Sequence, residues 1–139
     1  MRLELYEAEC QRIALECAAM LGEAKRLLAT PDRALTPLEQ GGVLHALQVL
    51  IENAIGKAKH KLKVAGADVP VSAYDAFALL AHRGLMPQQD LPQWNAVVGL
   101  RNRIVHDYMN VDMAQIATIV QTDQHAFVVE FLRNPIQAP

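Results

Sequence analysis

The sequence has few of the features that mark secreted, membrane-bound or disulfide-rich proteins. It contains only two cysteines in 139 residues, and no apolar run approaches the roughly 18 residues that a membrane-spanning helix needs. Residues 1–9 are mixed and charged, unlike the apolar core of a signal peptide. Cys10 and Cys17 lie seven residues apart on one expected helix face, which separates them by about 10 Å, too far for a disulfide. We therefore expect two reduced core cysteines in a cytoplasmic protein that contacts no membrane.

A strong net charge and the patterns of metal or phosphate sites are also missing. The formal net charge is −2, so no broad positive field marks a nucleic-acid binder, and any contact with RNA must be local. There is no glycine-rich phosphate loop and no nucleophile elbow. We expect neither a metal nor a cofactor, because four of the histidines lack the spacing of metal ligands. They are His45, His60, His82 and His125.

What the sequence does contain is apolar periodicity of the helical type. Apolar residues make up 52% and charged residues 20% of the chain, which fits a single globular domain over residues 1–139. Apolar residues in steps of four and three predict a first helix over residues 3–29, stopped by Thr30-Pro31. Its stripe consists of Tyr6, Cys10, Ile13, Cys17, Met20, Ala24 and Leu27.

Capping residues define the second and third helices. Residues 36–39, Thr-Pro-Leu-Glu, combine an N-cap, a proline at the first helical position and a capping-box glutamate. The helix that they begin should end near Gly66. Ser72 can cap a short third helix that Gly84 closes. The expected inward residues are Leu44, Leu47, Ile51, Ala54, Ala58 and Leu62 on the second helix, and Tyr74, Phe77 and Ala81 on the third.

The rest of the chain predicts a loop and two more helices. Residues 86–92 hold two prolines and should form the loop, followed by a fourth helix over residues 92–108. Asp112 can cap a fifth helix, which Asn134-Pro135 ends. Strand-like alternation is absent, so we predict an all-α fold, an antiparallel bundle of four or five helices able to pair with a second copy. The inward residues of the fifth helix should be Met113, Ile116, Val120, Phe127 and Phe131.

The fourth helix carries an arginine where its apolar stripe predicts a hydrophobic residue. The stripe is Trp94, Val98, Arg101, Val105 and Tyr108. A buried unpaired guanidinium is costly, so Arg101 needs an acidic partner, a water-lined cleft or an anionic ligand. The alternative is a structural salt bridge or a stem that reaches the surface.

A histidine lies on a different face of the same helix. At about 100° per residue His106 is about 140° from Arg101, on a small and polar stripe with Asn95, Gly99 and Asn102. Either the arginine reaches around, or the helix loosens near Tyr108, or a second subunit completes the site. The alternative role of His106 is a favourable cation at the negative end of the helix dipole.

These residues belong to a longer pattern. The spacing from Arg101 through His106 to Tyr108 is followed by Val111-Asp112. Upstream stand Ile51-Glu52-Asn53-Ala54, Tyr74-Asp75-Ala76-Phe77 with Leu80 and Gly84, and Val98-Gly99-Leu100-Arg101-Asn102. Over about residues 40–115 the pattern resembles the HEPN superfamily and, more narrowly, the HepT-type toxins of prokaryotic toxin–antitoxin pairs.

The resemblance implies a helical homodimer whose paired motifs line a cleft and cleave RNA without a metal. In that chemistry His106 would move protons at the ribose 2′-hydroxyl or the leaving oxygen. Arg101 would hold the scissile phosphate, and Asn102 would support them by hydrogen bonding. The expected products are a 2′,3′-cyclic phosphate and a 5′-hydroxyl.

The resemblance also implies a partner and a modification. The partner would be a small nucleotidyltransferase antitoxin that attaches AMP to Tyr108, placing anionic groups beside His106 and blocking the cleft. The alternative for Tyr108 is a core aromatic. The whole chain has an alternative as well, a non-catalytic regulatory or substrate-binding subunit of the nucleotidyltransferase, or a bundle in which the motif is incidental.

Two further groups of charged residues allow weaker interpretations. Asp107 and Arg103, four residues apart, predict a surface ion pair. A basic cluster at the end of the second helix could contact RNA. Alternatively, its positive charges lie there only because cations are stabilised at the negative end of the helix dipole. Its members are Lys57, Lys59, His60, Lys61 and Lys63.

Overall fold

The structure is a computed structural model that describes residues 2–136, and within them it is entirely helical, with no β-strand. The predicted all-α fold is therefore confirmed. Six α-helices and two short 3-10 helices follow one another along the chain. They are α1 (Leu3–Ala29), α2 (Pro37–Val64), α3 (Ala73–His82), η1 (Gln88–Asp90), α4 (Leu91–His106), η2 (Tyr108–Asn110), α5 (Met113–Gln121) and α6 (Ala126–Arg133).

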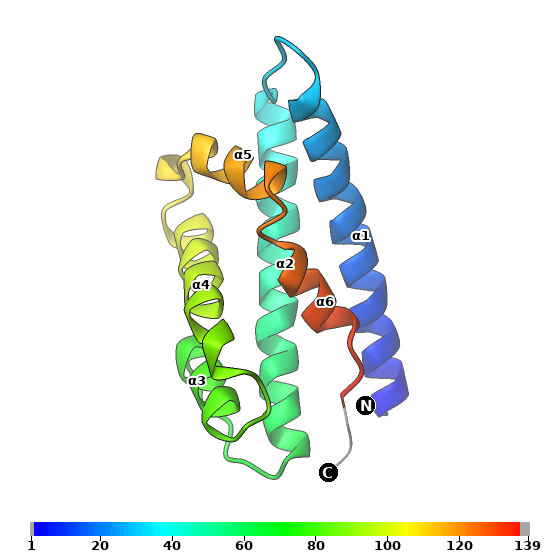
Figure 1. The fold of residues 1–139 in the computed structure, drawn as a ribbon, viewed down its shortest axis with the longest axis vertical. Helices are drawn as coiled ribbons and strands as arrows, with labels where there is room; N and C mark the ends of the chain where they lie inside the picture. The colour runs from blue at the N-terminus through cyan, green and yellow to red at the C-terminus, as the bar shows by residue number, and fades with distance from the viewer. Residues whose placement is uncertain (1, 137–139) are drawn as a thin grey trace.

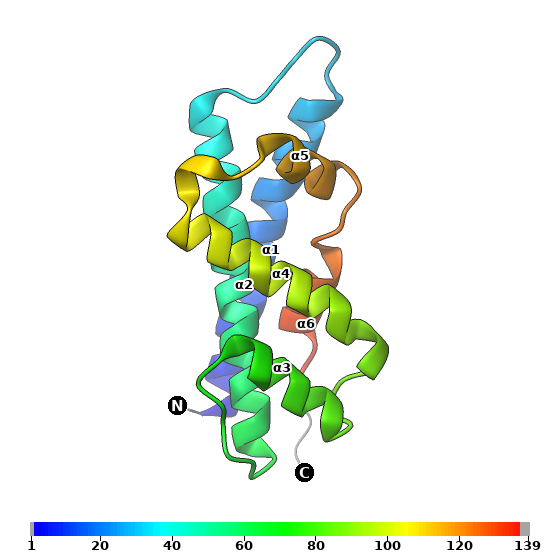
Figure 2. The same cartoon turned by 90° about the vertical axis from the view of Figure 1, so that its left-hand side faces the viewer.

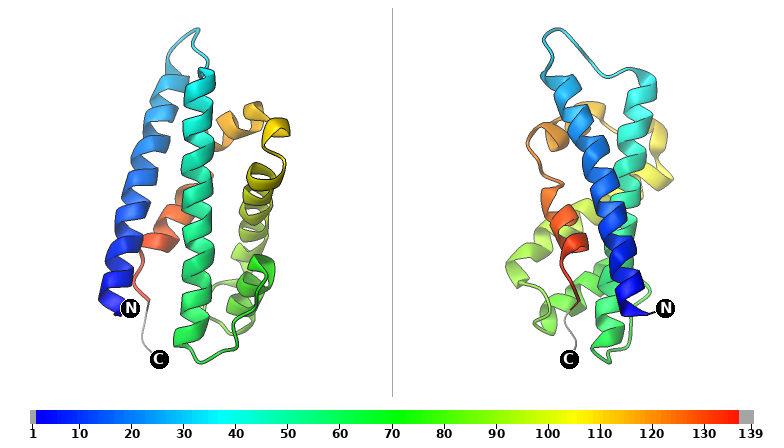
Figure 3. Two further views of the ribbon diagram at one scale, coloured as in Figure 1. Left: turned by 180° about the vertical axis from the view of Figure 1, so that it is seen from behind. Right: turned by 90° about the vertical axis from the view of Figure 1, so that its right-hand side faces the viewer.

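The helix α2 is the central element of the fold. It lies antiparallel beside α1 and also packs against α3, α4 and α6 (Figure 1). The helix α4 runs antiparallel to α2 and crosses it obliquely (Figure 2). The helix α5 lies across the bundle, and α6 returns along it to α1 (Figure 3). No helix in the described part of the chain is long and apolar enough to cross a membrane.

The predicted boundaries of α2 and α3 are confirmed. Thr36 caps α2, since its hydroxyl accepts a hydrogen bond from Glu39 N at 3.2 Å and the Glu39 carboxylate accepts one from Thr36 N at 2.9 Å. Ser72 accepts a bond from Asp75 N at the start of α3. Gly66 and Gly84 follow the helix ends with φ of +77° and +72°, the left-handed conformation that glycine adopts without strain.

The buried stripe of α2 is confirmed, whereas that of α1 is partly wrong. All six predicted α2 residues are buried. On α1, Cys10, Cys17 and Ala24 are buried as predicted, but Met20 is 42% exposed and Leu21 is buried in its place. The reason is that α1 packs against α5 and α6 as well as α2, which turns its buried side by one residue.

The predicted fifth helix is wrong, because residues 113–133 form two helices. The break falls at residues 122–125, where Asp123 has a φ of +56°. The structure therefore has six α-helices over residues 2–136 instead of four or five. The cap at Asp112 is confirmed, since its carboxylate accepts a bond from Ala114 N at 3.0 Å. The chain turns at Asp123, and this turn lets α6 lie along the bundle while α5 lies across it (Figure 1).

An aromatic cluster joins three helices. The ring of Trp94 on α4 stacks on Phe77 of α3, with centroids 4.3 Å apart. It also meets Phe127 and Phe131 of α6 edge to face, at 4.9 and 4.7 Å. Such arrangements contribute about 0.5–1.5 kcal/mol per pair beyond the burial of apolar area. The predicted inward position of Tyr74 is wrong, since its side chain is 40% exposed.

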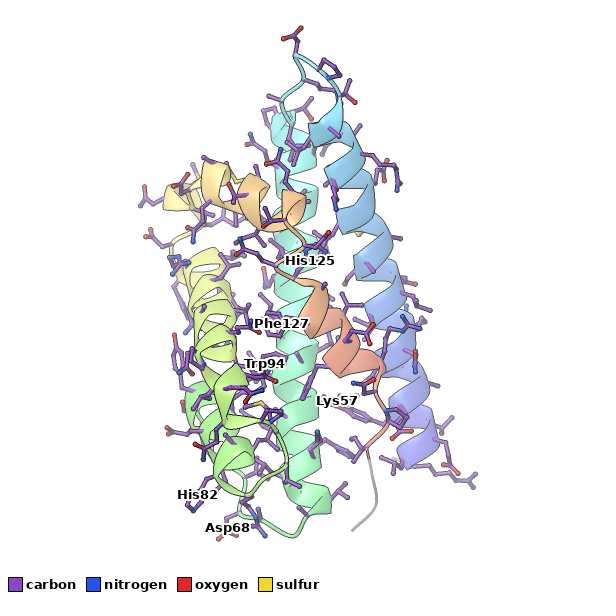
Figure 4. The ribbon with its side chains drawn as sticks, viewed as in Figure 1. Lys57, Asp68, His82, Trp94, His125 and Phe127 are labelled. Carbon is purple, nitrogen blue, oxygen red and sulfur yellow. The ribbon has the colours of Figure 1, made fainter. Side chains whose placement is uncertain are left out.

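A buried lysine fastens α6 to α2. Lys57 is 2% exposed, and its Nζ donates hydrogen bonds to the carbonyl oxygens of Phe131 (2.6 Å), Leu132 (3.1 Å) and Asn134. Burial lowers the pKa of Lys57. Its three donors match carbonyl groups that have no partner within the helix, and its charge lies at the negative end of the α6 dipole (Figure 4).

We expect Lys57→Met to lower the free energy of unfolding by about 2–4 kcal/mol, because it keeps the apolar stem but leaves buried carbonyls without a donor. The measurement is urea unfolding followed by circular dichroism. Lys63→Met is the matched control, since Lys63 is exposed in the last turn of the same helix. Equal stability of the two variants would show that the carbonyls find other partners.

Candidate functional site

The candidate site lies at the C-terminal end of α4. Trp94 and Val98 are buried as predicted, but the buried stripe then continues through Leu100 and Ile104. The prediction that Val105 lies inward is wrong, since it is 41% exposed. Because α4 crosses α2 obliquely, the side of α4 that faces the core changes along its length (Figure 2). The last turn of α4 therefore presents Val105 and its neighbours to the surface.

Arg101 lies at the edge of the buried stripe and faces α2. Its side chain is 23% exposed, and its Nη1 lies 3.7 Å from the Glu52 carboxylate. That separation is an ion pair but is too long for a hydrogen bond. The buried Nε of Arg101 has no hydrogen-bond partner in the described part of the chain. An acidic partner, one of the three possibilities predicted for Arg101, is thus present, and the ion pair also agrees with the alternative of a structural salt bridge. The guanidinium still has donors to offer an anion.

His106 is the last residue of α4 and is exposed, while Asn102, one turn earlier, is half-buried. The helix loosens directly afterwards, as one of the predicted alternatives requires, because Asp107 leaves helical geometry with φ −144° and ψ 43°. Arg101 and His106 both precede this change. The end of the helix therefore does not bring their side chains onto one face.

Tyr108 is a surface residue, so its interpretation as a core aromatic is wrong. It lies in η2 and is 49% exposed. Its hydroxyl reaches the start of α2, where a Cβ added to Gly41 would lie 3.6 Å from Tyr108 Oη. The ring therefore covers the start of α2 beside the candidate site, and about half of the residue remains exposed.

Two tyrosines and a carboxylate complete this face. A Cβ added to Gly99 on α4 would lie 3.3 Å from Tyr74 Oη, so Tyr74 closes the polar stripe of α4 against α3. From the sequence, Glu52 appears only as part of the longer pattern and Tyr74 as an inward residue of the third helix, and neither is predicted to lie at the site. Their proximity to α4 depends on helix packing, which the residues of α4 do not encode. Neither of the two described cavities is lined by Arg101 or His106.

The weaker charged candidates serve the fold. Lys59 donates to Val71 O at 2.7 Å and Lys61 to Leu85 O at 3.3 Å, while Lys57 is buried. Contact of Lys57 with RNA is therefore excluded, and the bonds of Lys59 and Lys61 leave their ammonium groups less free for it. The predicted pair of Asp107 with Arg103 is wrong, because Asp107 Oδ1 instead accepts a bond from Asn110 Nδ2 at 2.8 Å. Residues 2–136 contain no group of three or more histidine, cysteine, aspartate or glutamate side chains that could hold a metal ion.

Known proteins are similar to this chain in sequence and in fold. The family model of ribonuclease HepT-like proteins matches residues 15–133. The mRNA nuclease HepT of Shewanella oneidensis is 34% identical over 82 residues, which are 59% of this chain and 62% of that protein. A putative RNase of Archaeoglobus fulgidus is 28% identical over 104 residues, covering 75% of this chain and 77% of that protein.

Solved structures show the same fold. The tri-AMPylated HEPN toxin of Shewanella oneidensis, in complex with its MNT antitoxin, superposes with a TM-score of 0.65 at 23% identity, covering 87% of this chain and 96% of that one. A mutant MntA–HpeT toxin–antitoxin structure gives a TM-score of 0.67 at 23% identity, covering 94% and 96%. The HEPN fold is thereby shown, and the match of the family model over most of the chain decides its membership. The chain belongs to the ribonuclease HepT-like family.

Proposed function

We propose that this chain is the toxin of a toxin–antitoxin pair, an endoribonuclease that a nucleotidyltransferase antitoxin silences. The observation that carries the proposal is the state of Arg101, a largely buried guanidinium whose Nε has no partner, on the same helix end as the exposed His106. A purely structural arginine would use its donors within the fold. The family and its HepT relative support an RNA phosphodiester as the anion.

The reaction needs only a base, an acid and a phosphate-binding cation. A neutral His106 takes the proton of the 2′-hydroxyl, whose oxygen attacks the adjacent phosphorus. The bond from phosphorus to the 5′-oxygen breaks, and that oxygen takes up a proton. The products are a 2′,3′-cyclic phosphate and a 5′-hydroxyl, and no water is consumed. Arg101 stabilises the charge that builds on the phosphate oxygens, and Asn102 supports the site by hydrogen bonding.

A homodimer would bring together Arg101 and His106, which lie on different faces of α4 in one chain. Arg101 faces α2, whereas His106 faces outward, so one chain does not direct both at the same phosphate. A second copy placed over this surface brings the His106 of one subunit toward the Arg101 of the other.

The role of Glu52 is to position Arg101. At 3.7 Å the carboxylate attracts the guanidinium without occupying its donors. Glu52 is 40% exposed, so the pair contributes little to folding, on the order of 0–1 kcal/mol. Its effect is therefore on the direction of the guanidinium and not on the stability of the fold.

Tyr108 is the proposed site of silencing. The residue is 49% exposed and stands two residues after His106, and its hydroxyl lies beside Gly41. Attack of the tyrosine oxygen on the α-phosphate of ATP releases pyrophosphate and leaves AMP on the ring. The added phosphate is anionic, so it competes with RNA for Arg101 and blocks access to His106.

We expect expression of the wild-type chain without its antitoxin to arrest growth and degrade RNA, and His106→Ala to do neither. Loss of a general acid–base group lowers the rate by about 10²- to 10⁴-fold. The measurements are growth after induction and the end groups of RNA cut by purified protein. His82→Ala, an exposed histidine of α3, is the matched control. If wild type and His106→Ala were equally harmless, the chain would instead be the non-catalytic partner of a nucleotidyltransferase.

A shared cleft predicts complementation between two inactive variants. In a mixed dimer of Arg101→Ala and His106→Ala, one of the two clefts carries an intact arginine from one subunit and an intact histidine from the other. We expect an equimolar mixture to recover about a quarter of wild-type cleavage after subunit exchange, as measured on a fluorescent RNA. No recovery despite exchange, shown by tagged subunits, would place a complete site within one chain.

Co-expression with the cognate nucleotidyltransferase should raise the intact mass of the chain by one or more AMP units. We expect Tyr108→Phe to abolish the added mass, because the nucleophilic hydroxyl is gone. Tyr74→Phe, another exposed tyrosine of the same face, is the control and should keep the modification. Unchanged modification of Tyr108→Phe would assign the acceptor to another residue.

A further inference from the structure

A cavity of about 460 Å³ lies on the other side of α4 from the candidate site. Its volume is within the range of about 300–1,000 Å³ that small-molecule sites occupy. It is bounded by α2, α4, α5 and α6, close to the start of α6, where Figure 4 labels His125 and Phe127. The proposed roles of Arg101, Asn102, His106 and Tyr108 do not involve it, and none of these residues lines it.

The cavity has apolar walls and a polar opening. Its walls are aliphatic, from residues such as Leu47, Leu50 and Ile119, with one aromatic ring, that of Phe127. Three exposed amides, Gln93, Gln115 and Gln124, and the exposed Arg103 surround the opening. None of the lining side chains is a carboxylate. The cavity thus favours a ligand with an apolar or aromatic body and a negative charge.

A buried histidine in the wall lacks a partner. His125 is 9% exposed, and its Nδ1 forms no hydrogen bond within the described residues. Burial lowers the pKa of His125, which favours the neutral ring, and a neutral imidazole has one nitrogen that donates and one that accepts a hydrogen bond. An unsatisfied buried polar atom costs free energy, and because Nδ1 has almost no accessible surface, a ligand with a matching polar group would recover that cost only after the ring turns toward the cavity. An aliphatic ligand would fill the walls but leave this atom unsatisfied.

We propose that this cavity binds a nucleotide, with the base between the apolar walls beside Phe127 and the phosphate at Arg103. A base is a flat ring with hydrogen-bonding edges, which suit both His125 and amides that donate as well as accept. The nucleotide is either free in solution or an unstacked residue of the RNA substrate. In the second case the inference rests on the proposed ribonuclease function and identifies a place where the RNA sequence is read.

Arg103 gives this site a position along the substrate. It follows Asn102 and precedes His106 by three residues, about one helical turn, so it lies between the cavity and the polar stripe of α4. A Cβ added to Gly99 on that stripe would lie 3.7 Å from Arg103 Nη1, which confirms that the guanidinium reaches the stripe. An RNA strand whose phosphates follow Arg103 would therefore lead from the cavity toward His106.

The test is a binding titration in the His106→Ala background, where RNA is not cut and binding is independent of cleavage. The probes are the four nucleoside 5′-monophosphates and a 12-nucleotide RNA of mixed sequence. We expect shifts in the side-chain amide signals of Gln115 and Gln124 and in the ring signals of His125, followed by nuclear magnetic resonance. Saturation by a monophosphate identifies a free nucleotide, and saturation only by the 12-mer identifies the RNA strand.

Filling the cavity should abolish this binding. Ala96 is an exposed residue of α4 that lines the cavity. We expect Ala96→Trp to lower the affinity for the saturating probe at least tenfold. Ala19→Trp, at an exposed residue of α1 outside the cavity, is the matched control and should bind normally. Arg103→Gln with Gln115→Ala alters only exposed side chains and serves as the second variant if Ala96→Trp does not fold. Equal binding by the control and the cavity variants, or shifts confined to Asn102 and Tyr108, would overturn the inference. Failure of wild-type protein to cut RNA would count only against the proposed function.

Discussion

The contact of the Lys57 ammonium group with the end of α6 holds together two parts of the chain that are far apart in sequence. An ammonium group of this kind is expensive to bury, and it is stable here only because three carbonyl oxygens of residues 131–134 accept its hydrogen bonds. Its position in α2 also fixes where α6 must end. The helix α6 then brings Phe127 and Phe131 to Trp94, and Trp94 sets the rotation of α4. The orientation of the candidate site thus follows from a contact on the other side of the core.

Three sides of α4 differ in chemistry, and the differences follow from what α4 packs against. The side toward α2 and α3 carries Arg101 with Glu52 nearby, and the outer side carries Asn102 and His106. The opposite side contributes Leu100 and Arg103 to the cavity. A single helix of sixteen residues therefore separates the proposed phosphate-binding Arg101 from the proposed nucleotide pocket. Substitutions on α4 can change one side with little effect on the others.

Much of the fold could be predicted from the sequence, because helix boundaries depend on residues that are close together in the sequence. The capping box at Thr36 and the glycine at position 66 fix α2 by contacts within a few residues, and both were confirmed. The break at Asp123 could not be predicted, since no proline or glycine marks it and the apolar spacing continues through it. The exposure of Val105 and Tyr108 also depends on the oblique crossing of α2 and α4, which is a property of the packing. The candidate residues were found from their spacing, whereas the neighbours Glu52 and Gly41 needed the three-dimensional structure.

The short length of α6 has a consequence for how the molecule can be observed. Eight residues are fewer than the about 12–15 that an isolated helix needs, so α6 is helical only while its two ends are held. One end is held by Lys57, and the other borders the cavity. When α6 detaches, the edge-to-face partners of Trp94 leave and water reaches the indole. Because Trp94 is the only tryptophan in the sequence, its fluorescence is a built-in optical reporter of the docking of this helix.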